Sequence, residues 1–265
     1  MNDNLISDCE HCFALCCVAL PYGKSADFPI NKEGGEPYGN ICNDNQCSIH
    51  NHLLKKGFKG CVSFECFGAG QHVSQQIYGG QDWRQNGGIA KQMFAVFPII
   101  HQLNEMLYYL NQSLCLDETK AYRNELKEIY ELTYRLTGLP PDDILEVDLV
   151  QHRFTVNEYL LRISDSVRNE INHEKKHKKA DYIAANLKYA KMAGINLRGK
   201  LCIAADFSHA DLRRVDFLGA DLRDAKLHSA DLTDCIFLTQ SQVNAAKGNI
   251  DTTLPDYVQR PRHWS

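Results

Sequence analysis

The 265-residue chain contains no run of about 18 apolar residues, the length that a helix needs to cross a membrane. Its first eight residues, Met1 to Asp8, include no basic residue and no apolar stretch, so we expect no secretory signal peptide. These two absences predict a cytoplasmic protein without a membrane partner. Because the cytosol keeps thiols reduced, structural disulfides are not expected either.

The chain also lacks a strong charge of one sign. Its 33 acidic and 29 basic residues give a formal net charge of −4, which indicates no general attraction to nucleic acids. The segment Gly68-Ala69-Gly70-Gln71 has neither the glycine spacing of a dinucleotide site nor the lysine of a phosphate loop. There is also no nucleophile elbow and no pair of catalytic carboxylates. The sequence therefore favours a protein that is not an enzyme, although catalysis stays open.

Cysteine, by contrast, is concentrated at the N-terminus. Four thiolates complete a tetrahedral zinc site or hold one iron–sulfur cluster, so eight could serve two sites, or one site with spare core thiols. We predict metal ligands among eight of the eleven cysteines, namely Cys9, Cys12, Cys16, Cys17, Cys42, Cys47, Cys61 and Cys66. The first four form the expected core of the site. Inert buried thiols and disulfides in an exported module are the weaker alternatives.

Helical periodicity begins after two glycine pairs, Gly79-Gly80 and Gly87-Gly88, which mark a boundary near residues 85–92. Apolar residues then recur at steps of three and four over 94–110, 126–136 and 156–167. This spacing predicts three amphipathic helices joined by short connections and packed antiparallel. A short basic run at 173–179 follows and reads as a solvated linker.

A five-residue repeat occupies residues 180–239. Its third position carries an apolar residue in every pentad, for example Leu212, Phe217, Leu222 and Leu232, which we place in an axial core. A period of five requires a backbone that turns a corner at every unit, and four corners make one coil of 20 residues. Twelve pentads then make three coils, whose ends need caps. Asp221 and Arg223 flank an inward residue and should face outward.

Both ends of the chain resemble known families. The repeat is similar to the pentapeptide-repeat family, with its A(D/N)LXX consensus, which implies a right-handed quadrilateral β-solenoid of about three coils. The pattern Cys9-x2-Cys12-x3-Cys16-Cys17, followed by Cys42-x4-Cys47 and Gly60-Cys61, resembles the CxxCxxxCC cysteine-cluster proteins. That second resemblance implies a zinc- or iron-chelating region, and some relatives, flagellin lysine methylases among them, hold an iron–sulfur cluster with it.

Together these observations predict a multi-domain architecture. It consists of a Cys-rich, metal-bound head at 1–90, a small α-helical domain at 91–173 and a basic linker at 174–179. The β-solenoid at 180–239 and a C-terminal cap at 240–265 complete the chain.

The predicted function is metal or iron–sulfur binding by the head, combined with protein–protein interaction through the repeat scaffold. The cofactor is zinc or an iron–sulfur cluster, and a protein partner docks on the solenoid or helical surface. A homodimer is compatible with these features, and nucleic acid is disfavoured. One alternative is a resistance-type DNA mimic that protects gyrase, but the repeat carries eight acidic and eight basic residues and so has no net negative face. The other alternative is a cluster-bearing modifying enzyme.

Overall fold

The computed structural model of the protein describes residues 5–169 and 180–264. The chain divides into two compact units, Met1–Leu116 with Lys120–Tyr159 and Asp117–Thr119 with Leu160–Ser265. The helix α7 (Leu149–Arg168) therefore contributes to both units. The predicted basic linker at 174–179 lies outside the described residues, and the predicted boundaries near 90 and 173 stay predictions.

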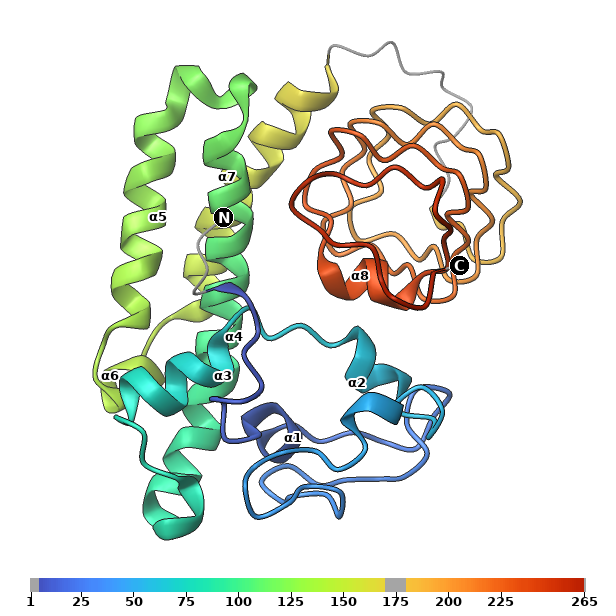
Figure 1. Ribbon diagram of the computed structural model, residues 1–265. Helices are drawn as coiled ribbons and strands as arrows, with labels where there is room; N and C mark the ends of the chain where they lie inside the picture. Colours follow the sequence, from blue (N-terminus) through green and yellow to red (C-terminus); the bar gives the residue numbers. More distant parts are fainter. Residues whose placement is uncertain (1–4, 170–179, 265) are drawn as a thin grey trace. The chain divides into compact units, whose positions relative to one another are not determined.

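The first unit is built on a long helix, α4 (Gly87–Cys115), which packs against α5 (Arg123–Thr137) and α6 (Pro141–Leu145). The Asn86 side chain caps α4 by accepting a hydrogen bond from the backbone of Gly88 at 3.0 Å. Helices α4 and α5 run side by side in opposite directions (Figure 1). Helices α4, α5 and α7 cover the three segments predicted to be helical. No helix in the described part of the chain combines the length and apolar character required to span a bilayer.

The cysteine-rich segment of this unit has only short elements. They are α1 (Leu15–Ala19), α2 (Lys59–Ser63), α3 (Ala69–Gln71), the 3-10 turns His50–His52 and Trp83–Gln85, and a π turn over His72–Ile77. Isolated antiparallel bridges join Tyr22 to Lys32 and Ile41 to Cys47. Helices α1 and α3 both contact α4, which supports this loop-rich region.

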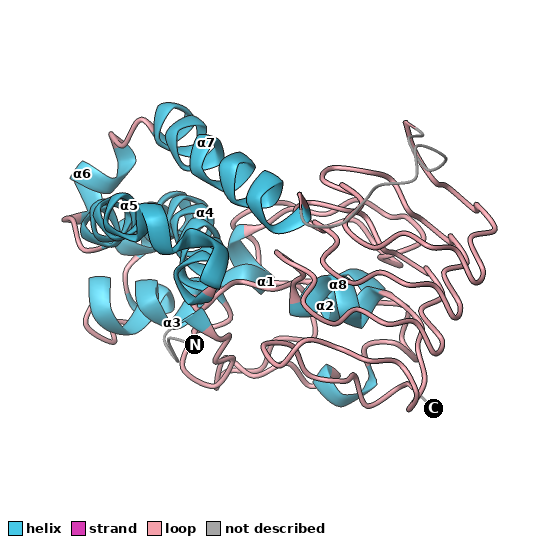
Figure 2. Cartoon of the chain, turned by 90° about the horizontal axis from the view of Figure 1, so that it is seen from above, coloured by secondary structure: helices cyan, strands magenta, loops and turns pink. Residues whose placement is uncertain are grey.

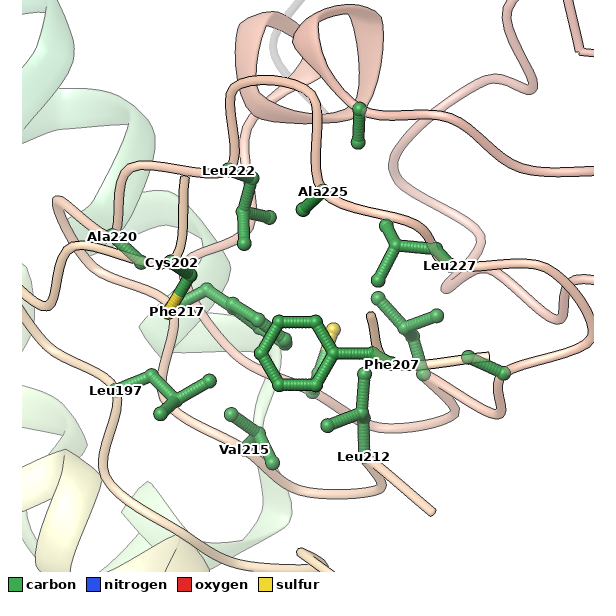
Figure 3. Packing of buried hydrophobic residues seen from close by; sticks show 14 of the residues in the cluster. Leu197, Cys202, Phe207, Leu212, Val215, Phe217, Ala220, Leu222, Ala225 and Leu227 are labelled. Atoms are coloured by element: carbon green, nitrogen blue, oxygen red, sulfur yellow. The ribbon is translucent and has the colours of Figure 1, made fainter. Parts of the chain in front are cut away.

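The second unit contains the repeat. All twelve third-position side chains are at most 7% exposed, so the predicted inward column is confirmed. Figure 3 shows part of this core, with Leu197, Phe207, Leu212, Phe217, Leu222 and Leu227 converging. Backbone bridges pair each coil with the next at a spacing of 20 residues, as in Asn186–Asp206 and Lys191–Asp211. The 20-residue turn predicted from four corners is therefore present.

The predicted β-solenoid of about three coils is wrong, because the described residues contain no β-strand and no sheet. The repeat consists of turns joined by single-residue bridges, and it is drawn as loop throughout (Figure 2). The fifth residue of each pentad, from Ala184 to Asp234, has a positive φ. These residues include bulky ones such as Tyr189 at 58° and His209 at 59°. A left-handed residue in every unit interrupts extended backbone, so no two consecutive residues pair as a strand requires.

The C-terminal end of the coil is closed by non-repeat residues. Helix α8 (Gln240–Ala245) begins with a capping box between Thr239 and Gln242. The Gln242 side chain also donates hydrogen bonds to the carbonyls of Phe217 and Ala220, both at 2.8 Å. Bridges from Lys226 to Lys247 and from Asp231 to Thr253 continue the stack beyond the repeats.

The last turns of α7 pack on one face of the same unit. Arg214 donates from Nε to the carbonyl of Val167 at 3.0 Å and pairs with Glu118. Asp216 is fully buried here, and Arg198 lies 3.7 Å from its carboxylate. Burial raises the pKa of Asp216, although a hydrogen bond with Ser164 opposes that shift. The end of α7 is thus part of the repeat unit.

Candidate functional site

A cavity of about 470 Å³ lies in the cysteine-rich segment of the first unit. Its size falls within the range of small-molecule and cofactor sites, well above the roughly 30 Å³ occupied by one water molecule. Seven of the eight predicted ligands line it: Cys9, Cys12, Cys16, Cys17, Cys47, Cys61 and Cys66. All are free thiols. Segments up to 57 residues apart in sequence, from Cys9 to Cys66, therefore bring their thiols to one place.

Cys42 is the predicted ligand that does not line the cavity. Its side chain is exposed, and its backbone belongs to a tight turn in which the Cys42 amide donates to the Gln46 carbonyl at 2.9 Å. The Arg84 guanidinium donates a hydrogen bond to the Cys42 carbonyl in this turn at 3.1 Å. Three histidines lie near the cysteines in the sequence: His50 lines the cavity, whereas His11 pairs with Asp8 at 2.7 Å and His52 is exposed.

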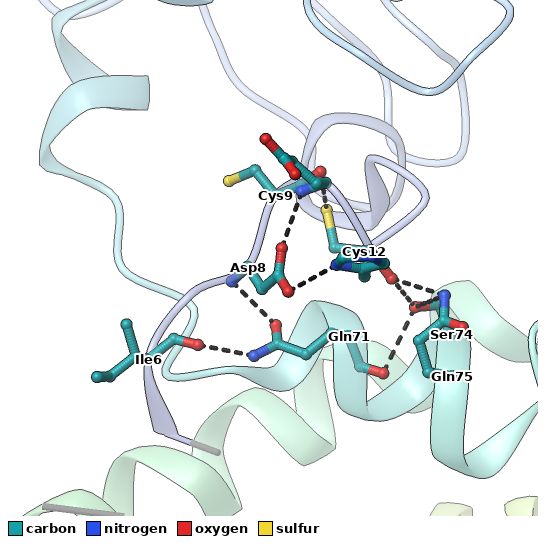
Figure 4. A network of polar contacts seen from close by, with 9 residues as sticks. Ile6, Asp8, Cys9, Cys12, Gln71, Ser74 and Gln75 are labelled. Atoms are coloured by element: carbon teal, nitrogen blue, oxygen red, sulfur yellow. Dashed lines mark hydrogen bonds and ion pairs between the residues drawn. The ribbon is translucent and has the colours of Figure 1, made fainter. Parts of the chain in front are cut away.

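The turn that carries Cys9 and Cys12 is held by a polar network (Figure 4). Gln71 accepts from the Asp8 amide at 3.2 Å and donates to the Ile6 carbonyl at 2.7 Å. Ser74 and Gln75 both donate to the His11 carbonyl, at 2.6 and 2.8 Å. These contacts attach the first two cysteines to the segment that follows Cys66.

Gly70 permits a close approach at the same place. A Cβ atom added to Gly70 would lie 2.6 Å from the Cys12 Cβ, closer than real contacts allow. Any side chain at position 70 would therefore displace Cys12 from the cavity wall.

Cys16 and Cys17 are presented by α1, which follows two residues of left-handed backbone, Phe13 and Ala14. Leu15 and Val18 are fully buried and anchor this helix. The two adjacent sulfur atoms lie 3.7 Å apart.

The remaining thiols have hydroxyl neighbours. The Tyr38 hydroxyl lies 2.6 Å from Cys47 Sγ, and the Ser7 hydroxyl lies 2.9 Å from Cys66 Sγ. Ser7 also bonds to the Glu65 carboxylate, which accepts from the Phe67 amide at 3.0 Å. Cys61 lies on α2.

Hydrogen bonds and burial shift the pKa values of the thiols in different directions. A hydrogen bond from Cys9 lowers the pKa of Cys12, and one from Cys16 lowers the pKa of Cys17. Burial raises the pKa of Cys61 to about 12. Its thiolate form therefore needs a nearby cation to become stable at neutral pH.

One fixed cation lies close by. Lys32 is 7% exposed, and its ammonium donates to the carbonyls of Val18, Leu20 and Glu33 at 2.7–2.8 Å. Its charge helps to lower the pKa of Cys17. Three hydrogen bonds to neutral carbonyls hold this positive charge near Cys17, where it can offset thiolate charge.

The donor set of the cavity suits a thiophilic metal, and a buried tyrosine hydroxyl, that of Tyr22, has no hydrogen-bond partner among the described residues. Within 5–169 and 180–264, however, no group of three or more His, Cys, Asp or Glu side chains is arranged to hold an ion. The thiols thus share one cavity without a formed coordination geometry. Metal binding would require the sulfur atoms to draw together.

Sequence reasoning did not identify Ser7, Tyr22, Lys32, Tyr38 or Gly70 as part of this site. Lys32 and Tyr38 stand between the two cysteine groups without any motif around them. Their roles depend on long-range contacts that local patterns do not encode. The concentration of thiols alone was visible in the sequence.

The family described as Pentapeptide repeats matches residues 202–237 in eight copies, so the second unit is that of a pentapeptide-repeat protein. The chain is also 52% identical over 272 residues to "Uncharacterized protein YybG" of Bacillus subtilis (strain 168), covering 100% of this chain and 98% of that protein. It therefore belongs to the same family as YybG. The match extends over both the repeat and the cysteine-rich segment.

Proposed function

We propose that this protein binds a metal through its N-terminal cavity and uses its repeat unit as a scaffold for a protein partner. The observation that carries the proposal is the meeting of seven free thiols in one cavity. Cys9, Cys12, Cys16 and Cys17 supply the core ligands. Cys47, Cys61 and Cys66 complete the site or form a second one that adjoins it.

The bound group is zinc or an iron–sulfur cluster, which would stabilise the fold in the first case and carry electrons in the second. The chain's own residues prepare for the charge of several thiolates. The Lys32 ammonium lies near Cys17, and hydroxyls lie next to Cys47 and Cys66. Such outer contacts orient ligands and tune a metal site.

The charges on the surface of the repeat unit argue against mimicry of DNA. Acidic residues in the second pentad position are paired with basic neighbours: Asp211 with Arg213 at 2.8 Å, and Asp221 with Arg223 at 2.7 Å. Asp206 lies between Lys188 and Lys226 at 3.6 and 3.5 Å. A surface of paired charges lacks the continuous negative field of a nucleic-acid mimic.

Metal analysis of anaerobically purified full-length protein tests the proposal. We expect stoichiometric zinc in a colourless solution, or iron and sulfide in a brown one. Cys12→Ser should strip the metal, whereas Cys42→Ser, a matched change outside the cavity, should retain it. Wild-type protein without metal, or equal metal content in the two variants, would contradict the proposal.

A further inference from the structure

The Tyr22 hydroxyl is buried and has no hydrogen-bond partner among the described residues. The residue itself is firmly placed. Its amide and carbonyl both bond to Lys32, at 3.0 and 2.9 Å, and its ring stacks on Phe28 with centroids 4.2 Å apart. A rigid donor without an acceptor costs free energy in a buried place, so it calls for an explanation.

Tyr22 lines the thiol cavity, and its hydroxyl lies within the electrostatic reach of Cys61, Cys17 and Cys47. Burial raises the pKa of Tyr22 to about 12, and the charges of those thiolates add to the shift. The hydroxyl therefore keeps its proton at neutral pH. It can donate a hydrogen bond, but the described residues offer it no acceptor.

A second tyrosine in the same cavity shows what such a donor does. The Tyr38 hydroxyl lies 2.6 Å from Cys47 Sγ, so a phenol already meets a sulfur on this side of the cavity. Tyr22 occupies a comparable position without reaching any sulfur. Tyr38 is buried and Tyr22 is half-buried, but the two phenols share the same chemistry, and they differ in having an acceptor.

We propose that Tyr22 donates a hydrogen bond to a metal-bound thiolate among Cys17, Cys47 and Cys61, and that it does so only when the site is loaded. This inference rests on the proposed metal binding. Loading draws the thiolates together and fixes their negative charge, which gives the hydroxyl a strong acceptor. Tyr22 is then a positioning residue that is unsatisfied in the metal-free protein and satisfied in the loaded one, and so favours loading.

The test measures two quantities on full-length Tyr22→Phe. Removing an unsatisfied hydroxyl should leave the melting temperature of the metal-free protein unchanged or raise it. The affinity for Zn²⁺, measured by competition with a chelator, should fall about 10- to 100-fold, the usual effect of losing an outer-shell contact. Loss of a purely structural hydroxyl would instead lower the melting temperature of the metal-free protein.

Tyr78→Phe is the matched control. The Tyr78 hydroxyl is also in the first unit, donates to Gln92 at 3.0 Å and does not line the cavity. Its removal should lower the melting temperature with and without metal and leave the Zn²⁺ affinity unchanged. Tyr38→Phe, which loses an existing bond to sulfur, should lower both quantities.

Two results would overturn the inference: Tyr22→Phe that binds Zn²⁺ as tightly as the wild type, or Tyr22→Phe that melts lower without metal. Either result leaves the proposed function standing if the wild type is metal-loaded. Wild-type protein that takes up no metal at all would overturn both.

Discussion

Single atoms decide how close the thiols come to one another, and Gly70 is the clearest case. Alanine is normally favoured over glycine in a helix by about 1 kcal/mol. In α3, however, the added Cβ would meet the Cys12 Cβ at 2.6 Å, and neither atom can rotate away. We predict that Gly70→Ala destabilises the protein by about 1–3 kcal/mol and lowers its metal content.

The control for this substitution is Gly87→Ala at the start of α4, where an added Cβ meets nothing within 4 Å. That variant should be neutral or slightly more stable in urea denaturation. Equal behaviour of the two alanine variants would show that Cys12 is not held by this contact.

A buried histidine makes the first unit sensitive to acid. Thr133 donates its only hydroxyl proton to the Ile129 carbonyl at 2.7 Å, so its oxygen accepts from His152 Nε2 at 2.9 Å. Burial lowers the pKa of His152 in the folded protein. The unfolded chain therefore binds the proton first, and stability that is present above about pH 6.5 is lost as the pH falls through the folded pKa.

We predict that the free energy of unfolding falls as the pH drops below about 6.5, and that His152→Gln makes this fall smaller. His72, whose pKa is also lowered by burial, contributes with the same sign and should keep part of the slope. The same substitution at exposed His263 should change nothing. A pH profile of His152→Gln that overlays the wild type would rule out this account.

Among the elements, the repeat coil depends on its inward column. Leu222 is 1% exposed, and its truncation to alanine removes buried surface and leaves a cavity. We predict a loss of about 2–5 kcal/mol in urea denaturation for Leu222→Ala. Arg223→Ala, at the adjacent and half-exposed position, should cost about 0–1 kcal/mol because surface ion pairs contribute little. A wild-type midpoint for Leu222→Ala would mean that the five-residue frame is misassigned.

The coil also shows which features of the fold the sequence pattern does not predict. The five-residue spacing identified the inward residue at the third position of each pentad from Tyr182 to Phe237, because the same position is buried in every pentad. It did not reveal that the backbone turns left-handed at the end of each pentad, since Tyr189, His209 and Arg214 carry no glycine signal there. Strands were therefore predicted where the chain makes turns.

The cavity was predictable to a similar degree. Cysteine spacing indicated a thiol site, but Cys42 and Cys47 are equally suggestive in sequence and only Cys47 lines the cavity. The difference arises because the tight turn that begins at Cys42 leaves its side chain in solvent. The contributions of Tyr22 and Lys32 depend on long-range packing and carry no local pattern.

At the scale of the whole chain, the end of α7 and the repeat coil belong to one compact unit. Arg214 joins them through the Val167 carbonyl, and Arg213 beside it pairs at the surface with Asp211 and Asp231. We predict that Arg214→Ala lowers the stability of this unit by about 1–3 kcal/mol, whereas Arg213→Ala costs about 0–1 kcal/mol. Similar denaturation curves for the two variants would show that α7 does not stabilise the coil.

The stacking of residues 20 apart has a consequence for how the length of the coil can change. Five residues inserted after Gly219 would move every later pentad, and α8 with them, to the neighbouring face; Gln242 would keep the carbonyl of Ala220, and an inserted residue would take the place of Phe217. Twenty inserted residues would add one whole turn, and that turn would supply equivalent carbonyls to the cap. Added length in complete turns should therefore keep the cap on its present face of the coil, whereas a single added pentad should carry it to the neighbouring face, although the pentad is the unit that the sequence repeats.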